Sequence, residues 1–214
     1  SENVFSNFQA LEFLSLIFTA GGSSETVSAL LANGANLIVE RKIFDEMMNE
    51  DIFIHKHASG DDMFLLNFVK QTYGKDSVQF MKHEDAIMET KTAQSLRDFL
   101  NQRKRWVSKS KSYTDPWLIT TALVVLLTAF AQLFSLFAGI FVAEFLGFTA
   151  IIWGLKLFVD FVVLYFVALF SHQKRLLRWF LPASIIYPFY VVISALTGLS
   201  SGYNWKARSY SRGQ

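Results

Sequence analysis

The chain has 214 residues, of which 52% are hydrophobic and 16% aromatic, and its 22 Phe exceed what a soluble core of this size needs. Residues 1–115 carry 13 Lys+Arg against 16 Asp+Glu, whereas residues 116–214 carry 7 against 2. Neither half is basic enough for a nucleic-acid-binding protein. Cysteine is absent, which excludes disulfides, a thiolate nucleophile and a cysteine-based zinc site.

The N-terminal residues lack the basic start, apolar core and small-residue cleavage site of a signal peptide. Because position 1 is Ser rather than Met, we expect the chain to begin inside a larger protein. Apolar residues recur at helical spacing from Phe5 to Phe18 but on more than one side, so this helix should be deeply buried or lie on a membrane. A break is expected at residues 21–24, with a short helix from Ser24 through Leu31.

The rest of residues 1–115 has the pattern of an α/β unit. A turn at residues 34–36 precedes a short strand at 37–39, and helices are expected to begin near Lys42 and at Asp61. Short strands are predicted at 77–81 and 86–90, and a helix at 92–108.

Three apolar blocks follow Pro116, at residues 117–143, 148–170 and 179–199, and each reaches the roughly 20 residues that cross a bilayer as helix. Residues 201–214 form a basic tail. The basic loop at 171–175 is expected on the cytoplasmic side, but three full crossings would place the tail opposite to it. Pro182 and Pro188 make the third block the candidate for a kinked, re-entrant or interfacial helix, and the side of the tail stays open.

Charged residues within the second block are Lys156 and Asp160, four positions apart. Isolated charges are costly in a membrane and usually face a partner or a cavity. The two form either an ion pair that faces other helices or a polar contact to a lipid-linked substrate.

Asp61 and Asp62 follow a Ser-Gly pair at an expected helix start. Carboxylates there are favoured by the helix dipole, so capping alone explains them. A general base also needs such a position, from which it can reach an acceptor hydroxyl while a neighbouring carboxylate tunes its pKa. The pair therefore acts either as a helix cap or as a catalytic base with its neighbour.

A second candidate site is Gln102-x-x-Arg105-Trp106. Arginine offers a fork of donors for a diphosphate, glutamine both a donor and an acceptor, and the indole a flat face for a sugar. The alternative is a basic, aromatic interface anchor before a membrane helix. Gly34 allows the backbone to approach a ligand closely, and Asn36 can hydrogen-bond a hydroxylated ligand. The alternative is a plain turn.

His55 and His57 alternate as on one face of a strand and could ligate a metal with Asp61 or Asp62. The alternative is an exposed strand end flanked by lysine.

The order and spacing of these motifs resemble the membrane-bound family 2 glycosyltransferases, which include cellulose, chitin and hyaluronan synthases and ceramide glucosyltransferases. The resemblance rests on Asn33-Gly34-Ala35-Asn36-Leu37, on Ser59-Gly60-Asp61-Asp62 and on Gln102-Arg-x-Arg105-Trp106 before membrane helices. The tail Trp205-Lys206-Ala207-Arg208 is similar to the Trp-Lys/Arg-Gly-Arg tail of some members, with Ala207 in place of the usual Gly.

The resemblance implies the acceptor-side part of a GT-A-like, Rossmann-like catalytic domain, followed by about three membrane helices. It implies inverting transfer from a nucleotide-diphosphate sugar to a lipid or polysaccharide acceptor. By likeness, Asp62 deprotonates the acceptor beside Asp61. Gln102, Arg105 and Trp106 hold the donor diphosphate and border the acceptor, and Gly34 and Asn36 belong to the substrate-binding set.

The family's early Asp and Asp-x-Asp metal motif have no counterpart in these 214 residues. A divalent metal, Mg or Mn, is expected for the whole enzyme, with its ligands outside this chain, and the chain alone is expected to be inactive. The expected location is the bacterial inner membrane, with the catalytic part cytoplasmic. Alternatives are a non-catalytic membrane scaffold and a metal-dependent membrane hydrolase built on His55, His57 and the Asp pair.

Overall fold

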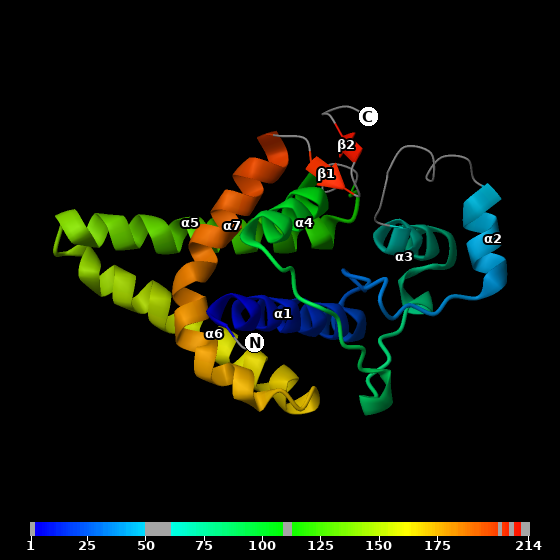
Figure 1. Cartoon of the computed structure of the whole chain (residues 1–214), viewed down its shortest axis with the longest axis horizontal. Coiled ribbons are helices and arrows are strands. Elements are labelled where there is room, and N and C mark those ends of the chain that lie inside the picture. The colour runs from blue at the N-terminus through cyan, green and yellow to red at the C-terminus, as the bar shows by residue number, and fades with distance from the viewer. Residues whose placement is uncertain (1–2, 50–60, 109–112, 201–202, 206–207, 211–214) are drawn as a thin grey trace.

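A computed structural model describes residues 3–49, 61–108, 113–200, 203–205 and 208–210 (Figure 1). Its α-helices are α1 Val4–Thr26, α2 Arg41–Asn49, α3 Asp61–Tyr73, α4 Leu96–Ser108, α5 Pro116–Phe141, α6 Phe145–Phe170 and α7 Phe180–Ser200. Three short 3-10 helices are η1 Lys75–Ser77, η2 Glu84–Ala86 and η4 Lys174–Trp179. The strands β1 Tyr203–Trp205 and β2 Arg208–Tyr210 pair antiparallel.

Helix α1 is longer than predicted. It starts with a capping box between Asn3 and Ser6 and runs without a break through Thr26, so the predicted break at 21–24 and second helix through Leu31 are wrong. The hydroxyl of Ser24 donates to the carbonyl of Gly21 at 2.8 Å. A serine whose hydroxyl donates to a carbonyl of the preceding turn can remain inside a helix. Without such a bond, serine favours the end of a helix, where it acts as a cap.

The strands predicted at 37–39, 77–81 and 86–90 are absent from the described residues, where these segments are irregular or 3-10 helical. Val78 has extended backbone angles, φ −114° and ψ 126°. A strand, however, is defined by its hydrogen-bonded neighbour, and none pairs with these segments in the described part of the chain. No Rossmann-like sheet is therefore seen there, and the α/β prediction for this part is wrong for the described residues.

The three predicted apolar blocks are confirmed as helices α5, α6 and α7. Asp115 begins α5, because its carboxylate accepts from the N–H groups of Trp117 at 2.8 Å and Leu118 at 3.3 Å and Pro116 follows at the first helical position. In the described residues, α1 joins these three as a fourth helix long and apolar enough to cross a membrane.

Helix α6 packs on α1 through an apolar cluster. Leu11 and Leu14 of α1 are buried against Leu164, Val167 and Ala168 of α6. The expectation that the first helix is buried is confirmed on this face. The packing fixes the first helix of the chain against the membrane helices.

Both ends of α7 return to the part of the chain that precedes Pro116. Before α7, in the loop that precedes η4, the imidazole of His172 lies 3.2 Å from the carboxylate of Glu84 in η2. At the end of α7, β1 lies against α4, and a Cβ on Gly198 would come within 2.5 Å of Val107 of α4. Figure 1 shows α5 and α6 projecting together as a hairpin, with α7 crossing both of them in this view. This arrangement lets the basic loop and β1 lie on one side.

Cysteine labelling tests this topology, because the chain has no native cysteine. We expect a membrane-impermeant maleimide to label Gln173→Cys and a cysteine appended after Gln214 from the same side. Ala143→Cys, in the turn between α5 and α6, should be labelled only from the opposite side. Labelling of the tail and of Ala143→Cys from one side would show instead that α7 crosses.

Candidate functional site

Helix α3 presents the predicted carboxylate pair. Its apolar side chains, among them Leu65 and Phe68, are buried, which fixes the start of the helix. Asp61 and Asp62 are the first two residues, where the exposed N–H groups of a helix favour negative charge. The predicted helix start is thus confirmed. Asp61 is exposed and Asp62 is half-buried.

Asp62 contacts the predicted turn at residues 34–36. The N–H of Gly34 donates to one carboxylate oxygen of Asp62 at 3.1 Å, and the N–H of Met63 donates to the other at 2.9 Å. These residues are 28 positions apart in the sequence. The structure therefore brings together two motifs that sequence analysis had placed in one site.

Asn36 has a local structural role. Its side-chain amide donates to the carbonyl of Ala86 at 2.5 Å, and its backbone N–H donates to the carbonyl of Asn33 at 3.0 Å. The first bond ties the 33–36 turn to the last residue of η2. With one N–H engaged, the second N–H and the carbonyl oxygen of the amide remain for a hydroxylated ligand.

Helix α4 carries Gln102, Arg105 and Trp106, and the residue that organises them is Arg103. Arg103 is 5% exposed, and its guanidinium donates to the side-chain carbonyl of Gln102 at 2.8 Å. The same group lies over the Trp106 ring, 4.1 Å from the centroid. Arg105 is half-buried on the same helix. The orientation of two of the three predicted residues therefore depends on a neighbour that sequence analysis passed over.

A buried ion pair holds Arg103 in place. Its guanidinium is paired with the carboxylate of Glu12 on α1 and donates to the phenol oxygen of Tyr190 on α7 at 2.8 Å. Tyr190 in turn donates to the other oxygen of Glu12 at 3.0 Å. The three side chains fasten α4 to α1 and α7 at one point. A carboxylate at position 12, among the apolar residues of the first half of α1, was the signal that could have indicated a buried cation.

Tyr113 is a further residue near Asp62. Burial, together with the negative charge of Asp62, raises the pKa of the Tyr113 phenol to about 12. The phenol therefore keeps its proton at neutral pH. A small cavity beside it is lined by Met63, Asn67 and Lys70 of α3 together with Thr114. Nothing in the sequence pattern singled out Tyr113, because it lies outside every recognised motif.

Lys70 ties α3 to the start of α5. Its ammonium group is paired with the carboxylate of Asp115 and donates to the carbonyl of Ala29 at 2.8 Å. Burial acts to raise the pKa of Asp115, but the hydrogen bonds from Lys70, Leu118 and Trp117 outweigh it and leave the pKa below its ordinary value of 3.8. The contact positions the Asp62 region against the first membrane helix.

Acid should weaken this link. Because the folded-state pKa of Asp115 is depressed, its stabilisation is present above pH 3.8 and is lost as the pH falls through the lowered folded-state value. We expect the melting temperature of Asp115→Asn to be below that of the parent at neutral pH and the gap to narrow in strong acid. The measurement is thermal unfolding in detergent over a pH series. An equal gap at every pH would contradict the role of this carboxylate charge.

No group of three or more His, Asp or Glu side chains gathers to hold a metal within the described ranges. His55 and His57 lie outside the described residues. The carboxylate of Asp62 accepts from two backbone N–H groups, and no third acidic or histidine side chain joins Asp61 and Asp62 in a cluster within the described residues. The described residues therefore do not fit a metal centre.

A comparison with known families identifies the chain. A family described as "Glycosyl transferase family group 2" matches residues 1–198, which include both candidate motifs and all the membrane helices except the last two residues of α7. No curated protein and no solved structure matches significantly. The apolar helices are compatible with an integral membrane protein. The chain is a member of glycosyl transferase family group 2.

Proposed function

We propose that the chain forms the acceptor side of an inverting glycosyltransferase. The enzyme transfers a sugar from a nucleotide-diphosphate donor to a lipid or polysaccharide acceptor at the membrane. The observation that carries the proposal is the contact between Asp62 and the Gly34 N–H at 3.1 Å, in a chain whose family match spans both motifs.

Asp62 is proposed as the general base. The Asp62 carboxylate accepts from two backbone N–H groups, which fix its orientation. It can take the proton of an acceptor hydroxyl as that oxygen attacks the sugar. Asp61, exposed at the same helix start, adds negative charge beside it. Tyr113, protonated and close to Asp62, is suited to donate a hydrogen bond to the acceptor or to the base.

Gln102, Arg105 and Trp106 are proposed to bind the donor diphosphate and the acceptor end. Arginine pairs with phosphate oxygens through parallel N–H bonds, which suits a departing diphosphate. Arg103 is distinct from this set: its cationic group is already bound to Glu12, Tyr190 and Gln102. Its role is to hold the α4 motif in position.

Metal and nucleotide binding are proposed to come from residues beyond these 214. The sequence has no Asp-x-Asp motif, and the described residues contain no metal-ligand cluster. A divalent metal, when bound, offsets charge on the departing diphosphate. The chain alone is accordingly expected to show neither tight nucleotide binding nor transfer, and either activity in the isolated chain would refute this part of the proposal.

The test of the diphosphate role is Arg105→Ala in an active enzyme that contains this chain. Loss of one charged hydrogen-bond donor costs about 1.5–3 kcal/mol of binding free energy, so the affinity for the nucleotide sugar should fall about tenfold or more. Arg97→Ala is the matched control, because Arg97 is an exposed arginine on the same helix. Calorimetry of donor binding gives the readout. Equal affinity in both variants would remove Arg105 from the donor site.

A further inference from the structure

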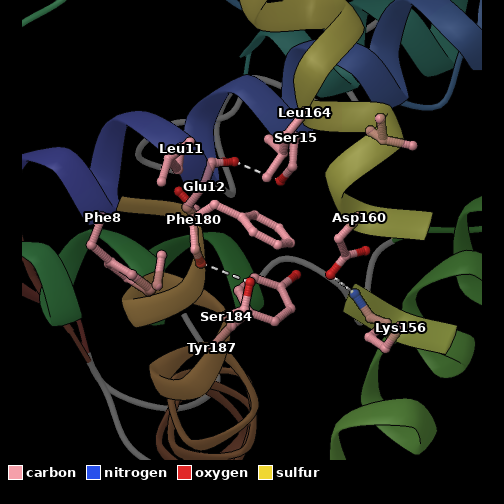
Figure 2. Close-up of a pocket in the computed structure, with 12 residues that line it drawn as sticks. Phe8, Leu11, Glu12, Ser15, Lys156, Asp160, Leu164, Phe180, Ser184 and Tyr187 are labelled. Atoms are coloured by element: carbon pink, nitrogen blue, oxygen red, sulfur yellow. Dashed lines mark hydrogen bonds and ion pairs between the residues drawn. The ribbon is translucent and has the colours of Figure 1, made fainter. Parts of the chain in front are cut away.

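A cavity of about 80 Å³ lies between α1, α6 and α7. Figure 2 shows Glu12 of α1, Lys156 and Asp160 of α6, and Ser184 and Tyr187 of α7 around it. Such a volume accommodates roughly five to eight water-sized groups. Asp62, Gln102, Arg105 and Trp106 are not among its lining residues, so it is separate from the proposed transfer site.

The depth of the cavity follows from the length of α6. About 20 helical residues cross the hydrocarbon core, so a crossing that begins at Phe145 ends at about residue 164. Lys156 and Asp160 then lie in the last part of that crossing, on the side to which both ends of α7 return. This is the level at which long charged side chains reach the headgroup region of that leaflet.

The charges that line the cavity are compensated in pairs. Lys156 forms an ion pair with Asp160, as one of the two sequence readings expected, and Glu12 is paired with Arg103. The Lys156 ammonium also lies 5.4 Å from the centre of the Tyr187 ring. Among the described lining residues, no cation is left over to neutralise a phosphate. An anionic headgroup would therefore be desolvated without compensation, which is costly.

Hydroxyl and carboxylate oxygens give the cavity its hydrogen-bonding capacity. The hydroxyl of Ser184 donates to the Phe180 carbonyl at 2.8 Å, and that of Ser15 donates to the Glu12 carbonyl at 2.7 Å. The hydroxyl oxygens of Ser184 and Ser15 keep lone pairs that can accept a hydrogen bond from a ligand hydroxyl. The Asp160 carboxylate can also accept one. Phe8, Leu11 and Leu164 supply an apolar wall for the adjoining glycerol carbons or acyl chain.

We infer that this cavity binds the uncharged, hydroxyl-bearing headgroup of a membrane lipid, of the size of a glycerol unit. Its oxygens accept from the ligand hydroxyl, its paired charges exclude phosphate, and its position suits a lipid that enters from the leaflet on the α4 side. Because Glu12 both lines the cavity and binds Arg103, the bound lipid would rest against the network that holds α4.

The experiment compares two lipids that differ by one phosphate. The chain is placed in phosphatidylcholine nanodiscs containing either diacylglycerol or phosphatidic acid, each with a diazirine on the acyl chain near the headgroup. After irradiation, mass spectrometry locates the crosslinks. We expect diacylglycerol to crosslink to peptides of α1, α6 and α7 that line the cavity, and phosphatidic acid to do so about tenfold less. Equal labelling, or preference for phosphatidic acid, overturns the inference.

Two variants test the cavity itself. Ser184→Leu fills it and should reduce diacylglycerol crosslinking about tenfold, whereas Thr197→Leu should not. Thr197 is the matched control because it lies on α7, is absent from the lining and bonds back to the Ile193 carbonyl in the same way. Tyr187→Phe removes one hydroxyl without changing volume, so it tests the site if Ser184→Leu disturbs packing; a loss of about two- to tenfold is expected. Unchanged crosslinking in Tyr187→Phe and Ser184→Leu overturns the inference.

This outcome is independent of sugar transfer, because the readout is lipid binding. A chain that crosslinks as expected but belongs to an enzyme without transferase activity would refute the proposed function alone. An active transferase with no cavity crosslinks would refute the lipid site alone.

Discussion

Replacing Arg103 by methionine is expected to lower the free energy of unfolding by about 3–5 kcal/mol, because it leaves a buried carboxylate without its partner. Glu12 and Arg103 side chains are both 6% exposed, and Tyr190 is bonded to each of them. Methionine keeps much of the packing against Phe99 and Trp106 while it removes the charge. The loss of stability should therefore reflect the broken ion pair and not a cavity left by a smaller side chain.

Thermal and chemical unfolding in detergent measure this effect. Arg97→Met is the matched control, because Arg97 is exposed on α4, and its change should stay within about 0.5 kcal/mol. Adding Glu12→Leu to Arg103→Met should recover part of the stability, since it removes the carboxylate that was left unpaired. If Arg103→Met and Arg97→Met were equally stable, Arg103 would not fasten α4 to α1 and α7.

The second large effect is expected for Asp62→Asn, which should reduce sugar transfer about 10²–10⁴-fold in an active enzyme that contains this chain. Asparagine keeps an oxygen that can accept from the Gly34 N–H, so the turn should remain in place. It lacks the charge needed to take a proton. Nucleotide-sugar binding should be unchanged, because Asp62 is proposed to act on the acceptor.

Two further variants make this result specific. Asp61→Asn should cost less than Asp62→Asn, since Asp61 is exposed and does not contact Gly34. Asp76→Asn, an exposed carboxylate in η1, should be silent. Rates come from transfer of a radiolabelled sugar under saturating donor. Full activity in Asp62→Asn would show that another group is the base.

The long apolar helices after Pro116 could be predicted from the sequence, whereas the strands predicted before Pro116 are absent from the described residues. Apolar runs longer than about 20 residues have few alternatives to membrane helix, so the blocks after Pro116 were found within a few residues. The residues 77–81 and 86–90 have the composition of strands, but a strand also needs a neighbour. Local pattern gives no information on whether that neighbour is present. Likewise, a serine after two glycines predicts the end of a helix, and only the structure shows that the Ser24 hydroxyl bonds within the helix.

The candidate site shows the same division. Asp62 and Gly34 belong to recognisable motifs, and the structure places them in hydrogen-bond contact. Arg103 and Tyr113 are missed because their roles depend on residues distant in the sequence. Arg103 contacts Glu12 on α1 and Tyr190 on α7, and the charge of Asp62 acts on Tyr113 because Lys70 joins α3 to the start of α5. Contacts between residues far apart in the sequence produce no regular spacing from which they could be predicted.

The most direct test of the account is the configuration of the product. An active enzyme that contains this chain is incubated with nucleotide-diphosphate sugars and a membrane acceptor, and the anomeric coupling of the transferred sugar is measured by proton NMR. A base on the acceptor side predicts a single displacement, so the new bond should have the opposite anomeric configuration to the donor. Retained configuration, or no transferred sugar with any donor, would contradict the proposed function.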